Sequence, residues 1–285
     1  MTLGLKHLRT VAFIGSVGED GARRLRGTGF FVGVAIPGND AQVHLYLVTA
    51  SHVVPPYEAT FVRIRRFVEA PPDVVLDEGL IDELVDDVPV TQWYRHPSHD
   101  IAAAPMVDAD DRWAISLVPM QEFVDDSDHV PSLGEPVFFA GLLAQVESMG
   151  EKHVPMLRSG TLGALHQTDI PMMEPGGGRR RLDGHLVDCR SFGGFSGSPC
   201  FVQMVRPGPP TPRMGLSTTE QHTLLLGMVG GHFDHQATVD VEGNTFSVPT
   251  SAGVAVVYPS ELIRELLDDG EVVEAREREE SAPTP

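Results

Sequence analysis

The sequence predicts an all-β protein that consists of two antiparallel halves, a connector between them and a short helix near the C-terminal end. Apolar runs of four to eight residues recur in both halves, and they are rich in Val, Ile, Phe and Tyr, as half-buried strands are. Turn-forming residues separate these runs, since the 285-residue chain contains 29 glycines and 23 prolines. A chain of this length accommodates either two modest domains or one large β unit.

Strand-like runs fill the first half, which we place at residues 1–110. Because the runs are short and closely spaced, we expect them to pair as antiparallel hairpins. Residues 71–90 interrupt the pattern with a proline pair and an acidic stretch, for which a short helix and a surface loop are both open. The predicted strands are 10–15, 27–34, 43–48, 59–65 and 101–105.

The second half, placed at 133–258, follows an acidic, proline-containing connector at 111–132. Two of its stretches, 172–183 and 206–219, are so rich in glycine or proline that we expect exposed loops instead of a strand ladder. The predicted strands are 136–142, 159–165, 200–204, 223–230 and 252–258.

A helix at 259–270 and an acidic disordered tail at 271–285 complete the predicted organisation. Pro259 and Ser260 are start signals for the helix, and Gly270 is a stop signal. The segment after Gly270 is highly charged, and chain ends of this kind are commonly poorly ordered.

The net charge argues against a nucleic-acid partner. The chain has 21 basic and 40 acidic residues, a formal net charge of -19, which is the wrong sign for binding phosphates by counterion release. Two stretches, 73–87 and 261–280, carry -13 of this charge, so we interpret most of the excess as a solvated loop and tail.

The compartment predicted from the sequence is the cytoplasm. Cys189 and Cys200 are too few to form a disulfide scaffold and lack the spacing of a metal or redox motif, so we expect two reduced thiols. The apolar run at 10–17 is short and has no cleavage pattern of a signal peptide. No run of apolar residues is long enough to span a bilayer.

The segment FGGFSGSP at 192–199 is the most informative for chemistry. A serine hydroxyl needs a base to remove its proton and a site that stabilises the oxyanion formed by its attack. Gly194 lies two residues before Ser196, so a glycine-rich turn could aim the N–H groups of Gly194 and Ser196 at one point. An ordinary Gly/Ser loop is the alternative for this segment alone.

A base and an acid for this serine occur in the first half. His52 follows an apolar strand in LVTASHVV, and Asp100 begins a small apolar element in HPSHDIAAAP. Alone, His52 would be a structural histidine and Asp100 a turn cap. The order His52, Asp100, Ser196, with the acid and base in one half and the nucleophile in the other, instead favours a catalytic triad.

In this order the sequence resembles the trypsin-like serine peptidases of the chymotrypsin fold, especially the bacterial branch related to the HtrA peptidases. The resemblance covers roughly residues 10–269. It also rests on GTGFFV before the histidine, TASHVV around it, HDIA at the aspartate, LGEPVFFAG in the second half, GGFSGSP at the serine, LLGMVGG after it and SAGVAVVYPSELIRELL at the end.

The resemblance implies two antiparallel six-stranded β-barrels with a short C-terminal helix and an active site in the cleft between them. It implies a serine endopeptidase that hydrolyses a protein or peptide substrate through an acyl-enzyme, with no cofactor, no metal and no membrane. About fifteen residues follow Gly270, so we expect no PDZ domain after the peptidase region. Phe195 stands where the digestive members have an aspartate that pairs with a newly cut N-terminus, so we expect no such activation.

Specificity is predicted from the same resemblance. Arg190, six residues before the nucleophile, would lie at the floor of the pocket for the side chain before the cut bond, and Gly230, Gly231 and His232 would form its wall. A buried arginine requires an anion, which suggests cleavage after Glu or Asp. The alternative is that a local insertion turns Arg190 outward.

Three alternative functions fit the sequence less well. An α/β-hydrolase requires G-x-S-x-G and the order serine, acid, histidine, but Ser198 occupies the last glycine position and His52 comes first. The pairs His96/His99 and His232/His235 lack the i, i+4 spacing of a helical zinc pair. A non-catalytic or partner-gated binding module of the same fold, with a regulatory protein partner, remains the main alternative.

Overall fold

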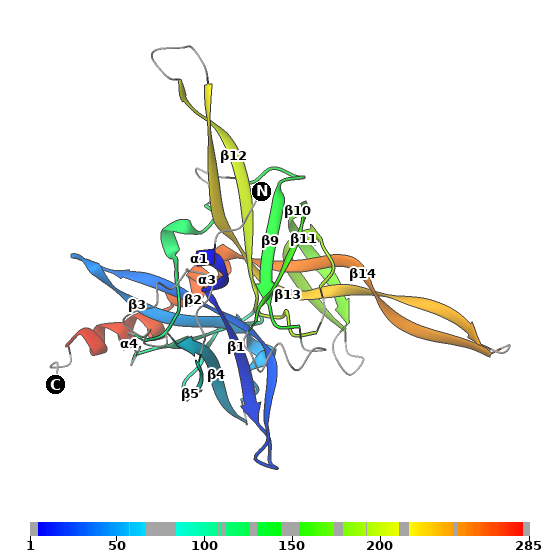
Figure 1. Ribbon diagram of the computed structural model, residues 1–285, viewed down its shortest axis with the longest axis horizontal. Coiled ribbons are helices and arrows are strands. Elements are labelled where there is room, and N and C mark those ends of the chain that lie inside the picture. Colours follow the sequence, from blue (N-terminus) through cyan, green and yellow to red (C-terminus); the bar gives the residue numbers. More distant parts are fainter. Residues whose placement is uncertain are drawn as a thin grey trace, which may run out of the picture.

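Two β units, one from each half of the chain, form the body of the protein (Figure 1). The first lies between residues 11 and 119, and the second between 136 and 259. In this computed structural model the described residues are 5–56, 58–66, 84–107, 109, 112–125, 130–143, 154–173, 179–191, 193–210, 217–241 and 244–281. Of residues 71–90, for which a short helix and a surface loop were both open, 71–83 lie outside the described residues. Residues 84–90 are neither helix nor loop, because they form a strand that pairs with the strand Ala59–Arg66.

The first unit is a sheet with the strand order β5-β4-β1-β2-β3-β7-β6, and every neighbouring pair along it is antiparallel. A short strand, β8, adds to β2 in parallel. Six of the described strands have five or more residues, and β6 and β8 have two each. The strands are β1 (Val11–Val17), β2 (Arg23–Ile36), β3 (Asn39–Ala50), β4 (Ala59–Arg66), β5 (Leu84–Val90), β6 (Tyr94–Arg95), β7 (Ile101–Pro105) and β8 (Val118–Pro119).

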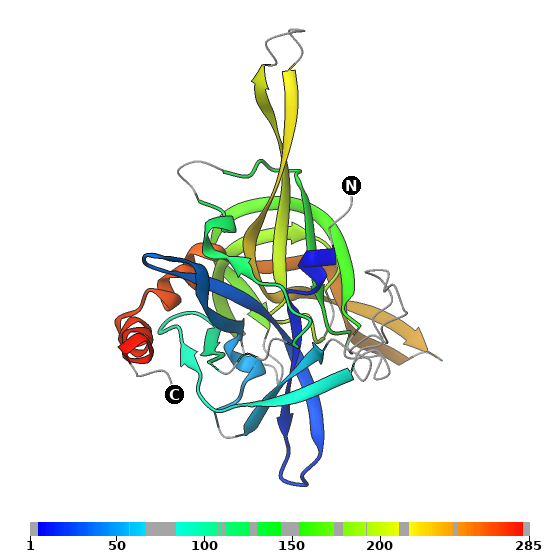
Figure 2. The ribbon, with the colours of Figure 1, turned by 60° about the vertical axis from the view of Figure 1, so that its left-hand side comes forward.

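The second unit is a closed antiparallel barrel of six strands within the described residues, in the order β10-β11-β14-β13-β12-β9 (Figure 2). Together the two units confirm the predicted all-β fold class and are consistent with a chymotrypsin-like double barrel. The second unit has the six strands predicted, whereas the first has eight among the described residues instead of six. The strands are β9 (Pro136–Gly141), β10 (Met156–Met173), β11 (Arg179–Asp188), β12 (Pro199–Pro210), β13 (Ser217–Val241) and β14 (Asn244–Pro259).

The two exposed loops predicted in the second half are largely strand. β10 and β11 pair as far as Met173 and Arg179, and β12 and β13 pair as far as Pro210 and Ser217. The β12–β13 hairpin projects from the body, as does the β13–β14 hairpin (Figure 1). The prediction was wrong because prolines are tolerated in a two-stranded ribbon, where each strand has a free edge, and the register shifts between residues 207 and 210.

The α-helices of the described residues lie near the two ends of the chain, and the C-terminal ones contribute buried residues to the core. They are α1 (Leu5–Leu8), α3 (Ser260–Leu267) and α4 (Gly270–Ser281), with 3-10 turns η1 (Ser51–Val53) and η2 (Met120–Glu122). The predicted C-terminal helix is α3.

Helix α4 corrects the prediction of a disordered tail from residue 271. Asp269 caps its N-terminus, since the Asp269 carboxylate accepts a hydrogen bond of 3.0 Å from the Glu271 N–H. Val272 is 1% exposed and belongs to the main core, and the Arg276 guanidinium lies 5.8 Å from the centre of the Tyr46 ring. A few contacts at helical spacing therefore order this charged segment against the first unit.

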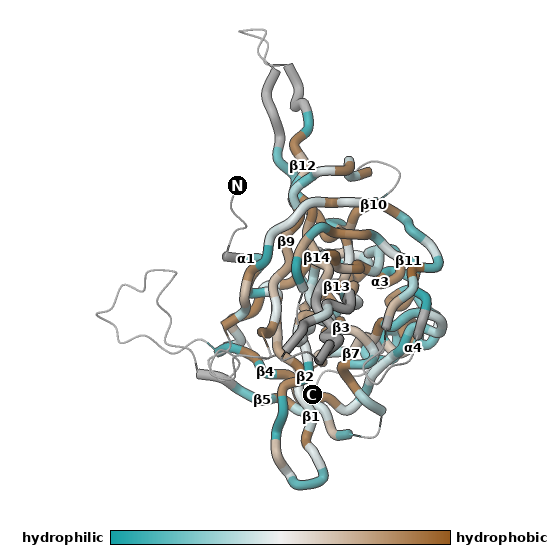
Figure 3. The backbone as a smooth tube through the Cα atoms, turned by 90° about the vertical axis from the view of Figure 1, so that its right-hand side faces the viewer, coloured by the Kyte–Doolittle hydropathy of each residue, from teal (hydrophilic) through white to brown (hydrophobic). Residues whose placement is uncertain are grey.

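One apolar core extends across both units, which is why they are held together. It includes Phe30, Val48 and Ile101 of the first unit and Phe201 and Tyr258 of the second. Figure 3 shows hydrophobic residues concentrated in the body, whereas the end of the β1–β2 hairpin is hydrophilic.

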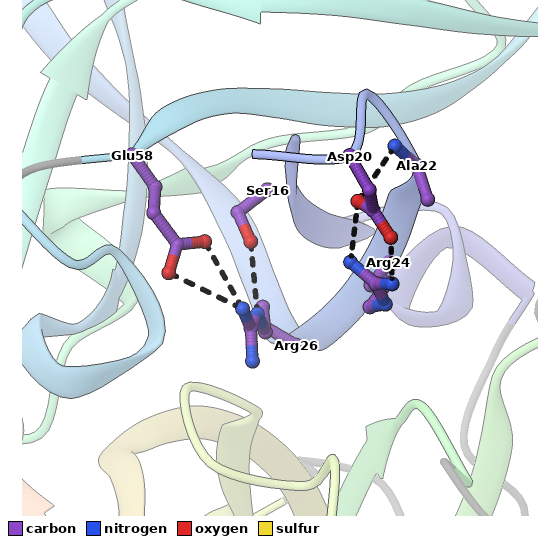
Figure 4. A network of polar contacts seen from close by, with 6 residues as sticks. All are labelled: Ser16, Asp20, Ala22, Arg24, Arg26 and Glu58. Carbon is purple, nitrogen blue, oxygen red and sulfur yellow. Dashed lines mark hydrogen bonds and ion pairs between the residues drawn. The ribbon is translucent and has the colours of Figure 1, made fainter. Parts of the chain in front are cut away.

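Polar contacts hold the β1–β2 hairpin (Figure 4). The Arg24 guanidinium donates hydrogen bonds of 2.5 and 3.1 Å to the exposed Asp20 carboxylate and lowers the pKa of that carboxyl to about 2. Arg26 donates to the Ser16 hydroxyl at 2.8 Å and to the Glu58 carboxylate at 3.0 Å.

The docking of α4 predicts that Val272→Ala lowers the free energy of unfolding by about 2 kcal/mol, because a buried side chain is truncated. Urea unfolding followed by circular dichroism measures it. Val107→Ala, at a side chain that is 64% exposed, is the control and should change little. Equal stability of the Val272→Ala protein and the parent would contradict the packing of α4.

Candidate active site

His52 lies in the 3-10 turn η1, directly after β3. The neighbouring Val53 and Val54 are 2% and 0% exposed, so the turn is anchored by apolar burial, whereas the His52 side chain is 41% exposed. The imidazole is therefore partly exposed on a turn whose backbone is held by the buried Val53 and Val54.

Strand register brings Asp100 to this turn. Ala50 at the end of β3 pairs with Ile101 at the start of β7, so the residues just beyond these ends are neighbours. A slip of one residue would turn every side chain of β7 to the other face. The Ser51 N–H donates to the Asp100 carbonyl at 3.1 Å, which closes the pairing.

The Asp100 carboxylate holds His52 at two points. Oδ1 accepts a hydrogen bond from the His52 backbone N–H at 2.8 Å, and Oδ2 lies 2.6 Å from Nδ1 of the ring. The Asp100 side chain is 11% exposed. An ionised carboxylate only accepts hydrogen bonds, so this contact favours a ring with a proton on Nδ1.

Ser196 lies in a tight turn that is bonded to both units. The Thr28 N–H of β2 donates to the Ser196 carbonyl at 3.0 Å, and the Gly197 N–H donates to the Val229 carbonyl of β13 at 2.9 Å. Gly194 and Gly197 have φ values of 99° and 86°, in the region that favours glycine. The serine is thus presented on a turn whose backbone is fixed from two sides.

Thr28 is a functional residue that the sequence reasoning missed. Its hydroxyl donates to the Gly194 carbonyl at 2.7 Å and accepts from the Leu142 N–H at 2.9 Å. The Thr28 carbonyl accepts from the Thr49 hydroxyl at 2.6 Å. The GTG segment at 27–29 predicts part of a strand and supports the resemblance, but neither signal assigns a role to Thr28, because its partners are backbone groups of distant segments.

Two glycines show how closely the serine turn approaches the histidine turn. A Cβ on Gly197 would lie 2.4 Å from the Thr49 hydroxyl and 3.1 Å from the Ala50 nitrogen, at the end of β3. A Cβ on Gly27 would lie 2.7 Å from a methyl of Val53 and 3.0 Å from the Ser196 carbonyl. The backbone at Ser196 therefore packs against the end of the strand that leads into His52.

The predicted triad is thus assembled in part by direct bonds. His52 and Asp100 are in contact, and the Ser196 turn is packed beside them. Among the hydrogen bonds of the described residues, none joins the Ser196 hydroxyl to the His52 ring. Within the same residues, the N–H groups of Gly194 and Ser196 donate to no protein acceptor. This pair of N–H groups is what an oxyanion site requires.

Arg190 does not have the environment that the specificity argument assumed. Its side chain is exposed, and its carbonyl accepts a hydrogen bond of 3.2 Å from Arg158. The premise of a buried arginine is wrong, because Arg190 lies just beyond the end of β11, where the chain leaves the barrel.

The predicted pocket wall lies on β13. Gly230 is buried against the Tyr258 ring, since a Cβ there would lie 2.4 Å from a ring carbon. Gly231 and His232 are half-buried, and a Cβ on Gly231 would lie 3.0 Å from the Met172 methyl. A bulge between Val229 and Gly231 separates this segment from the regular ladder.

Phe195 is fully buried in the core of the second unit. Its ring meets the Phe139 ring edge to face, with centroids 5.5 Å apart. The side chain at this position is therefore apolar and buried, and it offers no charged group for an ion pair with an N-terminus.

His96 and His99 lie with their Nδ1 atoms 3.2 Å apart, and burial together with His96 lowers the pKa of His99. No group of three or more His, Cys, Asp or Glu able to hold a metal occurs among the described residues. No described helix has the length and apolar character needed to cross a membrane.

Both thiols are free and buried. Burial raises the pKa of Cys189 and, more strongly, that of Cys200. Neither thiol therefore has the character of a reactive thiolate at neutral pH.

Comparison with known proteins identifies the family. A family model described as a trypsin-like peptidase domain matches residues 27–205, which include the His52 turn, Asp100 and the Ser196 turn. The chain belongs to this family of trypsin-like peptidases. Serine-protease hydrolysis of protein or peptide substrates is the chemistry of the family. No curated protein matches the chain significantly.

Two solved structures of one protease are among the matches of this chain. The inactive form of the Rv3671c protease is 16% identical, with a TM-score of 0.45, and the match covers 92% of this chain and 88% of that one. The inactive form of a serine-to-alanine mutant of Rv3671c from M. tuberculosis H37Rv is 14% identical, with a TM-score of 0.45, and the match covers 98% and 91% of the two chains.

The contacts of Thr28 predict that Thr28→Val destabilises the protein more than Thr28→Ser does. Valine leaves the buried Gly194 carbonyl and Leu142 N–H without their partner, which costs about 2–4 kcal/mol, whereas serine keeps the hydroxyl and loses about 1 kcal/mol. Urea unfolding of both variants measures the difference. Equal losses would show that the hydroxyl does not hold the serine turn.

Proposed function

We propose that the protein is a serine endopeptidase that uses His52, Asp100 and Ser196 as its triad. The observation that carries the proposal is the double contact of Asp100 with His52, at 2.8 and 2.6 Å, beside a glycine turn that presents Ser196. This contact fixes the imidazole tautomer in which Nε2 can accept a proton.

The proposed reaction has two halves. His52 Nε2 removes the proton of the Ser196 hydroxyl as its oxygen attacks the peptide carbonyl, and Asp100 stabilises the imidazolium. The N–H groups of Gly194 and Ser196 stabilise the oxyanion of the tetrahedral intermediate. The imidazolium then protonates the leaving amine as the C–N bond breaks. Water, activated by the same imidazole, hydrolyses the acyl-enzyme and regenerates the serine.

Two further features belong to the proposal. Formation of the oxyanion site needs no newly cut N-terminus, because Phe195 is apolar and buried. The compartment is the cytoplasm, in keeping with two free, buried cysteines and no disulfide among the described residues. No cofactor is part of the reaction.

A preference for acidic side chains before the cut bond is the finer part of the proposal. Arg190 is exposed, so its attraction for a carboxylate is screened and worth about 1 kcal/mol or less. Because 1.4 kcal/mol corresponds to a tenfold ratio, kcat/KM for Glu or Asp at this position exceeds that for an uncharged residue by at most about fivefold. The wall of the pocket for this substrate side chain would be formed by Gly230, Gly231 and His232 of β13.

The second candidate function is a partner-gated or non-catalytic effector module of the same fold. The observation that favours it is that no hydrogen bond joins the Ser196 hydroxyl to His52 among the described residues. In active enzymes such bonds are often long before substrate binds, so the observation does not by itself exclude the peptidase. Labelling that depends on an added cell extract would support the gated module.

Ser196→Ala tests the nucleophile directly. The parent chain, used without N-terminal trimming, should react with a fluorophosphonate probe and cleave casein, whereas Ser196→Ala should lose on the order of 10⁶ in kcat. Fluorescence of the labelled protein on a gel and release of peptides measure the two activities.

The matched control is Ser198→Ala, which removes a hydroxyl two residues away that faces the Cα of Gly141. This variant should still label. Casein cleavage by Ser196→Ala at the parent rate would remove the assignment of the nucleophile.

Arg190→Ala tests the specificity. The parent should favour peptides with Glu over Gln before the cut bond by up to about fivefold in kcat/KM, and the variant should show no preference. Matched peptide pairs that differ at this residue alone measure the ratio. A ratio that is unchanged in Arg190→Ala, or a parent that cuts after Leu, Phe or Arg, would contradict the acidic preference.

A further inference from the structure

The β6–β7 hairpin contributes more than Asp100 to the His52 turn. Arg95 in β6 pairs with Ala102 in β7, so Arg95 and Asp100 come from the two sides of one hairpin. Both reach across to η1, which follows the adjacent strand β3. Sequence reasoning assigned no role to Arg95.

The Arg95 guanidinium binds both ends of the turn that carries His52. Nη1 donates to the Ser51 carbonyl at 3.0 Å and to the Ser51 hydroxyl at 2.7 Å. Nη2 donates to the Val54 carbonyl at 2.5 Å. The planar fork of an arginine suits this task, because two of its nitrogens reach carbonyl groups that lie on either side of His52.

A three-residue 3-10 turn has little stability of its own. Within η1, the Val54 N–H donates to the Ser51 carbonyl at 3.2 Å. Two residues outside the turn bind its backbone. Asp100 accepts hydrogen bonds from the N–H groups of Ser51 and His52. Arg95 donates hydrogen bonds to the carbonyl groups of Ser51 and Val54. Hydrogen bonds from a charged donor are roughly twice as strong as neutral ones.

We propose that Arg95 is a positioning residue that holds the backbone of the His52 turn in register with Asp100 and Ser196. The inference rests on the proposed function. Without the guanidinium, the carbonyl side of the turn loses its anchor, and the imidazole keeps a single external hold through Asp100. A displacement of about 1 Å at a catalytic group lowers the rate by up to about 100-fold. The turn carries the base and not the substrate pocket, so we expect the loss in kcat and little change in KM.

Arg95→Met is the test variant, because methionine keeps the aliphatic stem and removes the three hydrogen bonds. We expect kcat per active site to fall by about 10- to 100-fold while KM stays within about twofold. Active sites are counted by fluorophosphonate titration, so protein that fails to fold does not enter kcat. Arg95→Lys, which can reach one carbonyl but not both, should have an intermediate kcat.

Added methylguanidine distinguishes a positioning role from a merely structural one, because only a positioning role predicts that it restores kcat. In Arg95→Ala, millimolar methylguanidine should restore part of kcat by occupying the place of the missing guanidinium. The control is Arg24→Ala, which removes an exposed arginine with an ion pair to Asp20 in the β1–β2 hairpin (Figure 4). Its kcat should be that of the parent, with or without methylguanidine.

The outcomes separate this proposal from the proposed function. A parent chain that neither labels nor cleaves would remove the peptidase and with it the role of Arg95. An active parent with an unchanged kcat per site in Arg95→Met would overturn the positioning role alone. The positioning role would also be overturned if total activity fell only in proportion to the number of titrated sites and methylguanidine restored none of it.

Discussion

The structure around the site depends on one carboxylate that binds one histidine twice. Asp100 accepts the backbone N–H and faces Nδ1 of His52, so a single group fixes the position of the turn and the tautomer of the ring. The pairing of Ala50 with Ile101 sets this contact through sheet register. The contact between Asp100 and His52 is therefore a consequence of how β3 and β7 pair.

The serine turn depends on a second constraint, which is its attachment to both units. Thr28 of β2 and Val229 of β13 bind the carbonyl of Ser196 and the N–H of Gly197. A core shared by the two units, with Ile101 and Tyr258 among its members, keeps these attachments in place. Neither unit alone presents all three residues of the proposed triad, so the proposed chemistry requires the packing that joins the two units.

Much of this arrangement could be predicted from residue patterns, because short β-rich runs and glycine turns have local causes. His52 and Asp100 meet as the sequence indicated. Contacts between distant segments could not be predicted: Thr28 and Arg95 act on backbone groups, which leave no pattern in the sequence. Helix α4 was missed because its order comes from packing, and the burial assumed for Arg190 was wrong because exposure depends on where β11 ends.

The most direct measurement of the central claim is the location of a fluorophosphonate adduct by peptide mass spectrometry. The account predicts one phosphonylated residue, Ser196, and loss of that adduct in Asp100→Asn, where the imidazole would no longer be held in the reactive tautomer. An adduct on another serine, such as Ser198, or labelling of Ser196 at the same rate in Asp100→Asn, would contradict it.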